Sequence, residues 1–251
     1  MCPLGAVVPG RSTGGRCAEC ARLDRAHSVA ADTMADDPRT YRVYLAWFGP
    51  GMVKVGITGE ERGAARLREQ GAVAFSWLGR GPLMAARRTE EVLRAALGVP
   101  DRIPYAKKRA LRGQLPGAEE RAGAVAELYA RAVELEGRGW PESLERLPLE
   151  VVDQMGIFGL DRAPDSAPVR SVRELVDGGV VAGRLVAAAG PDLHLAVADG
   201  GVVVLDTRLI TGWDLTAVSR ATEATEVTGS DVRVPLIDID IGGGGVQGGL
   251  F

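Results

Sequence analysis

The sequence is poor in aromatic residues, histidine and cysteine, and it has no long apolar run. Tryptophan, tyrosine and phenylalanine together make up 5% of 251 residues, and the chain contains only two histidines and three cysteines. An odd, small number of cysteines argues against a disulfide framework and for a reducing compartment. Because no apolar stretch reaches about eighteen residues and no secretion signal is visible, the sequence predicts a cytoplasmic protein without membrane contact.

The composition that remains is ordinary for a globular protein, but its charge is uneven. Hydrophobic residues make up 46% and charged residues 25% of the chain, enough for one large or two small domains. Residues 1–125 hold 20 basic against 13 acidic residues, whereas residues 126–251 hold 10 against 20. A basic half suggests an anionic partner such as nucleic acid, and chance clustering on a solvated surface is the alternative.

The first half contains an α/β pattern. Two apolar strands flank a Gly49-Pro50-Gly51 turn and predict a β-hairpin over residues 41–58. A helix over 60–70, a third strand over 72–78 and a second helix over 83–97 follow from the spacing of apolar residues and from glycines at the boundaries. The order ββαβα predicts a compact unit of about seventy residues, and the fold class is α/β in the broad α+β sense.

The second half begins with a helix and then becomes rich in β-branched residues. Residues 100–116 are expected to be irregular, residues 117–136 helical, and residues 180–215 a small antiparallel meander or barrel with a hairpin turn at Asp199-Gly200. His194 is expected on the surface. Asp238 and Asp240 alternate with isoleucines and could suggest a metal site, but an edge strand explains them better. We therefore divide the chain into a cysteine-containing N-terminal segment (1–40), an α/β module (41–115), a helical connector (116–165), a small β domain (166–218) and an acidic, glycine-rich tail (219–251).

The hairpin and the helix after it resemble a known family of enzymes. Arg42-Val43-Tyr44 and Lys54-Val55-Gly56 stand where the GIY-YIG nuclease superfamily has Gly-Ile-Tyr and Tyr-Ile-Gly. More closely, Lys54-Val-Gly-Ile-Thr58, Arg66 and Gln70-Gly71-Ala72 are similar to the bacterial family of domains of unknown function 2797. The wider resemblance covers about residues 15–110, and we expect the C-terminal meander only in actinobacterial relatives.

The resemblance implies a site for metal-dependent phosphodiester cleavage. In the superfamily a tyrosine helps to deprotonate water, an arginine grips the phosphate, and a glutamate holds a divalent metal that acts as a Lewis acid. Those roles would fall to Tyr44, Arg66 and Glu90, with Mg²⁺ or Mn²⁺ as the cofactor. Glu90 is preferred to Glu91 because Glu90-x-x-Leu93 matches the family's register.

Two departures from the superfamily keep a second function open. Lys54 replaces the tyrosine of the second motif, and Arg42 replaces the glycine of the first. The leading hypothesis is therefore action on DNA or RNA, either by cleavage or by binding without cleavage. The alternative is a catalytically inactive interaction protein whose β domain holds a protein partner. Individually, each of these residues also has an ordinary structural explanation.

Two further groups of residues are candidates for binding. Cys17-Ala-Glu-Cys20 has the spacing of half a zinc knuckle, which Cys2 and His27 would complete; an incomplete site or a redox pair are the alternatives. A basic stretch without acidic residues follows Asp101, and with Arg62 it would track a nucleic-acid backbone, while Tyr105 would stack on a base. Its residues are Arg102, Lys107, Lys108, Arg109 and Arg112. A solvated surface loop is the alternative.

Overall fold

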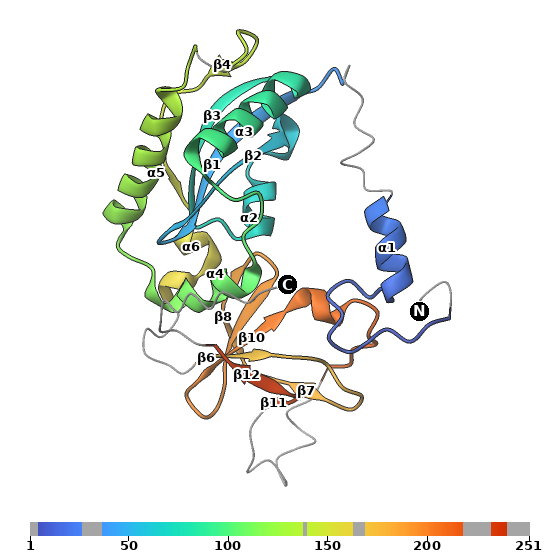
Figure 1. Cartoon of the computed structure of the whole chain (residues 1–251). Coiled ribbons are helices and arrows are strands. Elements are labelled where there is room, and N and C mark those ends of the chain that lie inside the picture. Colours follow the sequence, from blue (N-terminus) through green and yellow to red (C-terminus); the bar gives the residue numbers. More distant parts are fainter. Residues whose placement is uncertain (1–4, 27–36, 138–139, 163–168, 218–231, 240–251) are drawn as a thin grey trace, which may run out of the picture.

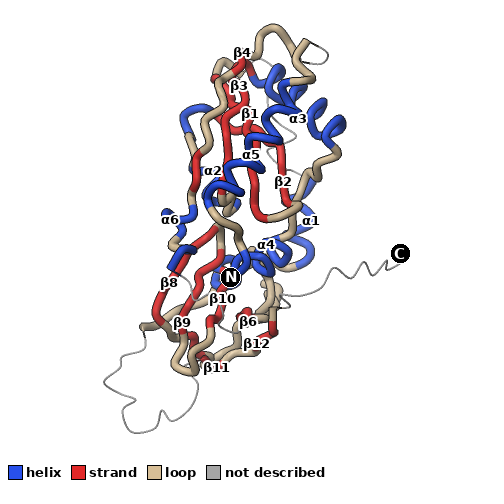
Figure 2. Tube along the Cα trace, turned by 90° about the vertical axis from the view of Figure 1, so that its left-hand side faces the viewer, coloured by secondary structure: helices blue, strands red, loops and turns tan. Residues whose placement is uncertain are grey.

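The described residues form two five-stranded β-sheets at opposite ends of an elongated molecule and a two-stranded ribbon beside the second, and helices surround the first sheet (Figures 1 and 2). The structure is a computed structural model that describes residues 5–26, 37–137, 140–162, 169–217 and 232–239. Its mixed α+β architecture confirms the predicted fold class. The helices α4 and α6 lie between the two sheets (Figures 1 and 2).

The first sheet is built on the predicted hairpin. The strands β1 (Thr40–Gly49) and β2 (Met52–Gly59) pair antiparallel, and β3 (Ala74–Pro82) pairs antiparallel with the other edge of β1. The connecting turn needs glycine at position 51, where φ is +68°. The third strand begins two residues later than the sequence pattern predicts. The reason is that Gly71 and Ala72 complete the C-terminal cap of the preceding helix, whose carbonyls accept their N–H groups.

Both faces of this sheet are buried, and alternate residues of β1 serve the two faces. Val43 and Leu45 pack against α3 (Leu83–Leu97) and α5 (Ala118–Val133), and Tyr44, Ala46 and Phe48 face the opposite side. The predicted helix over 60–70 is divided into a 3₁₀ turn, η1 (Glu60–Arg62), and a short helix, α2 (Ala65–Gln70). The break falls at Gly63, whose φ of +48° is incompatible with a continuous helix.

The segment expected to be irregular contains a helix. Residues 105–111 form α4 (Tyr105–Leu111), which begins after Pro104 and continues into η2 (Arg112–Gln114). Tertiary contacts stabilise it, because the Lys108 ammonium donates to the carbonyl of Gln70 at 2.8 Å and the Arg112 guanidinium to that of Gly71 at 2.6 Å. A sequence pattern contains no signal for such contacts.

The connector completes the first sheet and leads to the second. Two short strands from it, β4 (Glu145–Arg146) and β5 (Val152–Asp153), pair with β3. They are followed by α6 (Met155–Phe158) and η3 (Leu160–Arg162). An apolar cluster joins the two sheets, with Trp47, Val73 and Ala74 on one side, Ala187 and Ala189 on the other, and Phe158 between them.

The second sheet has the strand order β12-β6-β10-β9-β8. Its strands are β6 (Val169–Val172), β8 (Arg184–Ala189), β9 (Asp192–Ala196), β10 (Val202–Asp206) and β12 (Leu236–Asp238). A two-stranded ribbon, β7 (Val180–Val181) with β11 (Val232–Arg233), lies beside it, and η4 (Thr207–Ile210) follows β10. The predicted antiparallel meander is present as β8-β9-β10. Asp238 lies on an edge strand as expected, and Asp240 lies outside the described residues.

One expectation for this sheet was wrong. His194 is 4% exposed, not a surface residue, because the face of β9 that carries it is covered where the two sheets meet. The first helix, α1 (Ala18–Ala26), precedes the first sheet in the chain. Among the described helices, none is long and apolar enough to cross a membrane.

Candidate functional site

The centre of the candidate site is a tyrosine that lies across a glycine. Tyr44 on β1 pairs with Gly56 on β2, and a Cβ atom added at Gly56 would lie 2.8 Å from Cε2 of the tyrosine ring and closer still to its hydroxyl end. The second motif therefore ends in glycine for a steric reason, since any side chain there would displace Tyr44. The ring is 1% exposed and makes an edge contact with Trp77 at 6.4 Å between centroids.

Gln70, the last residue of α2, joins the tyrosine to Lys54. Its side-chain amide donates to the Tyr44 hydroxyl at 2.9 Å, and its amide oxygen lies 3.5 Å from the Lys54 ammonium. Lys54 stands beside Tyr44 on the same face of the hairpin, because it pairs with Ala46. In the sequence, Gln70 was only part of a match to the family. In the structure, its side chain contacts both Tyr44 and Lys54 and so helps to position them.

These side chains open into a cavity of about 950 Å³. The wall includes the predicted residues Tyr44, Lys54, Arg66, Glu90, Arg102, Lys108 and Arg109. They come from β1, β2, α2, α3, α4 and the loop before α4, so the fold brings together residues that are up to 65 positions apart in the sequence. Gly56 does not line the cavity itself, but it contacts the Tyr44 ring, which does.

The cavity wall is strongly basic. Seven basic side chains line it against three acidic ones. The basic residues are Lys54, Arg66, Arg87, Arg102, Lys108, Arg109 and Arg208, and the acidic residues are Glu90, Asp101 and Asp206. A concave surface of one charge sign concentrates ligands of the opposite sign, so the cavity favours an anion.

Burial changes the proton affinities of three predicted site residues. Burial raises the pKa of the Tyr44 hydroxyl, which favours a neutral phenol. It lowers the pKa of the Lys54 ammonium, against the smaller opposing effect of the Asp101 and Glu90 carboxylates. It also raises the pKa of Glu90, although Lys54 and Arg94 oppose this shift. Without a bound cation, the site therefore disfavours the charged forms of the groups that the resemblance places in catalysis.

Lys108 has the most perturbed amine of the site. Its ammonium group lies 4.1 Å from the centre of the Phe48 ring and 4.5 Å from that of Tyr105. Burial, followed by the charges of Arg112 and Lys54, lowers the pKa of Lys108 to about 7. An amine in this environment exchanges its proton near neutral pH, and a bound anion would favour its charged form.

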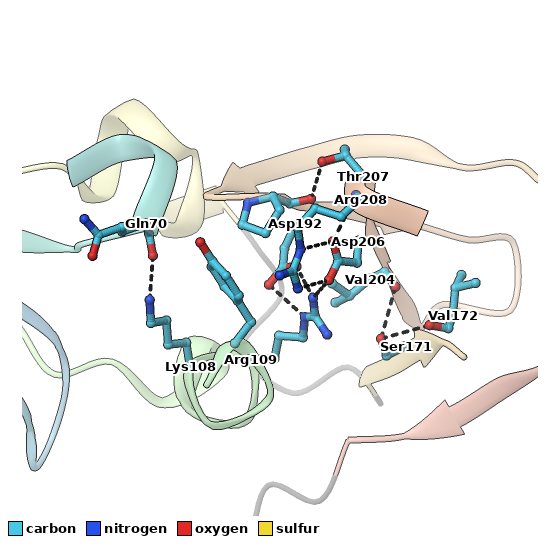
Figure 3. Close-up of polar contacts among 12 residues, drawn as sticks. Gln70, Lys108, Arg109, Ser171, Val172, Asp192, Val204, Asp206, Thr207 and Arg208 are labelled. Carbon is cyan, nitrogen blue, oxygen red and sulfur yellow. Dashed lines mark hydrogen bonds and ion pairs between the residues drawn. The ribbon is translucent and has the colours of Figure 1, made fainter. Parts of the chain in front are cut away.

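The other predicted basic residues are placed differently. Arg62 and Lys107 are exposed and do not line the cavity, and Arg62 pairs with Glu69 at 2.6 Å. Arg66 lines the cavity and pairs more loosely with the same carboxylate, at 3.6 Å. Arg109 bonds to two carboxylates of the second sheet, Asp192 and Asp206 (Figure 3). The predicted basic stretch thus divides into exposed, cavity-lining and structural cations.

Sequence patterns missed the contribution of the second sheet. Asp206 ends β10, and Arg208 follows in η4, where the Asp206 carboxylate caps the Arg208 N–H at 3.0 Å. Arg208 lies 4.4 Å from the ring centre of Tyr105, so the ring that we expected to stack on a base is in contact with two cations of the protein. The Asp206-x-Arg208 spacing is a short, local capping signal. It does not indicate that these residues line a cavity together with residues such as Lys108, which lies 100 positions before Arg208 in the chain.

The predicted zinc site is only partly within the described residues. Cys17 and Cys20 lie at the start of α1, where the Cys20 N–H lies 3.4 Å from the Cys17 sulfur. Cys2 and His27 fall outside the described residues. In the part of the chain that the structure describes, no group of three or more His, Cys, Asp or Glu side chains could hold a metal ion. The zinc site therefore stays a prediction.

The fold and the cavity together define an α+β protein whose two sheets contribute to one basic cavity. Comparison with known families adds one result: the chain belongs to the family described as protein of unknown function (DUF2797), whose model matches residues 9–215. That match extends through β10 and η4, well beyond the residues 15–110 over which we expected the resemblance. No curated protein and no solved structure matches the chain.

Proposed function

We propose that the protein binds the phosphate groups of nucleic acid in this cavity and cleaves a phosphodiester bond there with the help of a divalent cation. One observation carries the proposal: Tyr44, Lys54, Arg66 and Glu90 line a single cavity although they come from four different elements. By the resemblance, these residues stand at the positions of the ordered motif of the GIY-YIG nucleases, with Lys54 in place of its second tyrosine. Their convergence favours the nuclease resemblance over separate structural explanations for each residue.

The charge of the cavity supports phosphate as the ligand. Arg66 offers a planar guanidinium whose paired N–H groups match two phosphate oxygens, and Arg102 and Lys108 add positive charge nearby. Tyr44 accepts a hydrogen bond from Gln70, which leaves its own hydroxyl proton to donate to a phosphate oxygen. The raised pKa of this phenol keeps that proton in place at neutral pH.

Lys54 is suited to act as the base that the superfamily takes from tyrosine. Its lowered pKa increases the fraction of neutral amine, and only a neutral amine can accept a proton. In the reaction, water gives a proton to Lys54 Nζ, the resulting hydroxide forms a bond to phosphorus, and the bond to the leaving alkoxide breaks. The replacement of tyrosine by Lys54 is therefore compatible with catalysis.

Glu90 would hold a small hard cation as a single carboxylate ligand, since no group of three or more His, Cys, Asp or Glu side chains lies together among the described residues. Glu90 is the one acidic residue of the wall without an ion pair among the described residues, since Asp101 pairs with Arg94 and Asp206 with Arg109 and Arg208. Mg²⁺ is commonly held by one or two carboxylates together with waters and substrate phosphates. Such an ion would act as a Lewis acid on the phosphate. It would also favour the ionised form of Glu90, which burial alone disfavours.

The experiment that tests this proposal is cleavage of labelled single-stranded, duplex and branched DNA and RNA with Mg²⁺ or Mn²⁺. Three variants are compared with the wild type: Glu90→Gln, Lys54→Met and Glu91→Gln. Glu91 is the matched control because it is the adjacent residue, is exposed and does not line the cavity. We expect Glu90→Gln and Lys54→Met to lose cleavage by about 100-fold or more, and Glu91→Gln to behave as the wild type.

Binding measured on the same panel separates the two parts of the proposal. Wild-type affinity should fall steeply as the salt concentration rises, because phosphate binding releases counterions. Binding without metal-dependent cleavage would overturn the catalytic part. Salt-insensitive binding to a protein, with none to nucleic acid, would overturn the whole proposal and favour an interaction protein.

A further inference from the structure

The second sheet forms part of the cavity wall, and this limits what the cavity can hold. Tyr44, Lys54 and Glu90 belong to the first sheet and its helix, whereas Asp206 and Arg208 belong to the end of β10 and to η4. Thr13, which precedes α1, also lines the wall. The candidate catalytic residues therefore lie in a cavity to which both sheets contribute.

A buried ion-pair network fixes this wall in place. The Arg109 guanidinium bonds to the Asp192 carboxylate at 2.6 and 2.8 Å and also to that of Asp206 (Figure 3). The Asp192 and Asp206 side chains are 1% and 4% exposed, and that of Arg109 is 14% exposed. Together with the apolar cluster that includes Trp47 and Ala187, this network makes the second sheet a built wall of the site.

Arg208 is held on this wall with part of its guanidinium still available. Its Nε and Nη2 atoms donate to Asp206 at 2.9 and 2.6 Å, and the Tyr105 ring lies against the guanidinium. An arginine has five N–H donors, so a carboxylate that accepts two of them leaves others for a ligand. The side chain is 39% exposed and lines the cavity, which places those donors within reach of an anion.

The size and charge of the cavity favour a strand end over an internal segment. Its volume of about 950 Å³ lies within the range of small-molecule sites, so it has room for one or two nucleotides. A terminal phosphate carries more negative charge than an internal diester, about −1.5 to −2 at neutral pH by analogy with other phosphomonoesters. The wall is basic, and its Lys54 and Lys108 have no ion pair among the described residues, so it favours the more highly charged phosphate.

We propose that the cavity receives a terminal nucleotide with its end phosphate, and that Arg208 of the second sheet binds that phosphate. This inference rests on the proposed function, because it specifies which part of a nucleic acid enters the same cavity. The ligand chemistry, a phosphorylated nucleotide, occurs both at the end of a strand and in a free mononucleotide. A single-stranded end is the form that also presents a phosphodiester bond to Lys54 and Glu90.

The test compares labelled single strands of one sequence: a linear strand with a 5′ phosphate, one with a 3′ phosphate, one with hydroxyl ends, and a closed circle. A free mononucleotide serves as competitor. We expect a phosphorylated linear strand to bind about tenfold more tightly than the circle, since only the linear strand offers a terminal phosphate for a charge-assisted hydrogen bond from Arg208. In the Arg208→Gln variant that ratio should fall toward one. Arg184→Gln, an exposed change on β8, is the matched control and should keep the wild-type ratio.

Each result separates this inference from the proposed function. If the circle binds and is cut as well as the linear strands, the preference for ends is overturned while nucleic-acid binding stands. If none of the strands binds, the proposed function itself fails. A mononucleotide that binds tightly while no strand does would assign the cavity to a small-molecule ligand. Thermal melting of each variant verifies folding, and a wild-type ratio in folded Arg208→Gln would exclude Arg208 from phosphate binding.

Discussion

The lysines that line the cavity beside the first sheet and the buried carboxylates of the second sheet are held in opposite ways. Around the first sheet, Lys54 and Lys108 contact amide and carbonyl oxygens and aromatic rings, without an ion pair among the described residues. At the second sheet, Asp192 and Asp206 are bonded to arginines. Both sets are partly removed from water, but only the second has its charges compensated within the protein.

This difference separates a ligand site from a structural junction. A buried cation without a carboxylate partner has lost hydration, and this raises the free energy of the protein without ligand. A bound anion restores favourable interactions with the cation, so the unpaired cation favours anion binding. A buried ion pair is already satisfied, and its main effect appears when one partner is removed. By this criterion, Lys54 and Lys108 belong to the site. Arg109 belongs instead to the junction, by which we mean the buried ion-pair network of Arg109, Asp192 and Asp206 together with the residues packed around it, which forms part of the cavity wall.

The largest effect is expected when the junction loses its shared arginine. Arg109→Met leaves Asp192 buried without a positive partner and leaves Asp206 with Arg208 alone. Removal of one member of a buried ion pair costs about 3–5 kcal/mol. We expect the free energy of unfolding, measured by chemical denaturation, to fall by that amount.

An exposed ion pair of the first sheet is the matched control for this change. Arg80 pairs with Glu145 at 2.8 Å, but the two side chains are 44% and 61% exposed. Arg80→Met should therefore cost about 1 kcal/mol or less. Equal effects of the two substitutions would contradict the distinction between a junction and an ordinary surface pair.

Acid should destabilise the junction through His194. Burial, followed by the charges of Arg112 and Arg109, lowers the pKa of this imidazole to about 4, from an ordinary value near 6.5. The folded state then keeps His194 neutral, whereas the unfolded chain becomes protonated as the pH falls below 6.5. The folded protein should lose stability as the pH falls from about 6.5 to about 4, by up to about 3 kcal/mol from this residue.

The variant His194→Phe isolates that contribution, because it keeps an aromatic ring and removes the titrating group. Nε2 of His194 has no hydrogen-bond partner among the described residues, so the variant loses no bond at that atom. The unfolding free energy of wild type and variant is compared between pH 7.5 and pH 4. Parallel curves across this range would show that His194 does not titrate on unfolding.

The sequence predicted the first sheet far better than the junction. Apolar alternation, the glycines and the helix spacing identify the hairpin, α3 and α5, because those signals are local. Tyr44, Lys54, Arg66 and Glu90 likewise occur along the chain in the same order as the positions of the family motif, so a motif comparison can identify all four. The partners of Arg109 cannot be found in this way, since Asp192 and Asp206 lie 83 and 97 residues away.

His194 illustrates why the second sheet was harder to predict. Alternation along β9 placed His194 on the face opposite Leu193 and Leu195 and assigned the buried face to the leucines. In the structure the face of Asp192 and His194 is the buried one and the two leucines are only partly buried, so apolar positions do not mark burial along this strand. Packing between the two sheets decides the outcome, and that information is not local.

The smallest expected effect concerns the steric contact at the centre of the site. Gly56→Ala would place a methyl group against the Tyr44 ring, which is 1% exposed and in contact with Trp77 and therefore has little room to move. Overpacking of this kind costs about 1–3 kcal/mol. We also expect cleavage to fall, because the displaced hydroxyl no longer meets Gln70.

The control is Gly123→Ala on the exposed face of α5, where no atom lies within 4 Å of the new methyl group. There alanine should stabilise the helix by about 0.5–1 kcal/mol. The same substitution should thus change the unfolding free energy in opposite directions at the two positions. A Gly56→Ala protein that is as stable and active as the wild type would show that Tyr44 can move without loss, which would remove the steric reason for glycine in this motif.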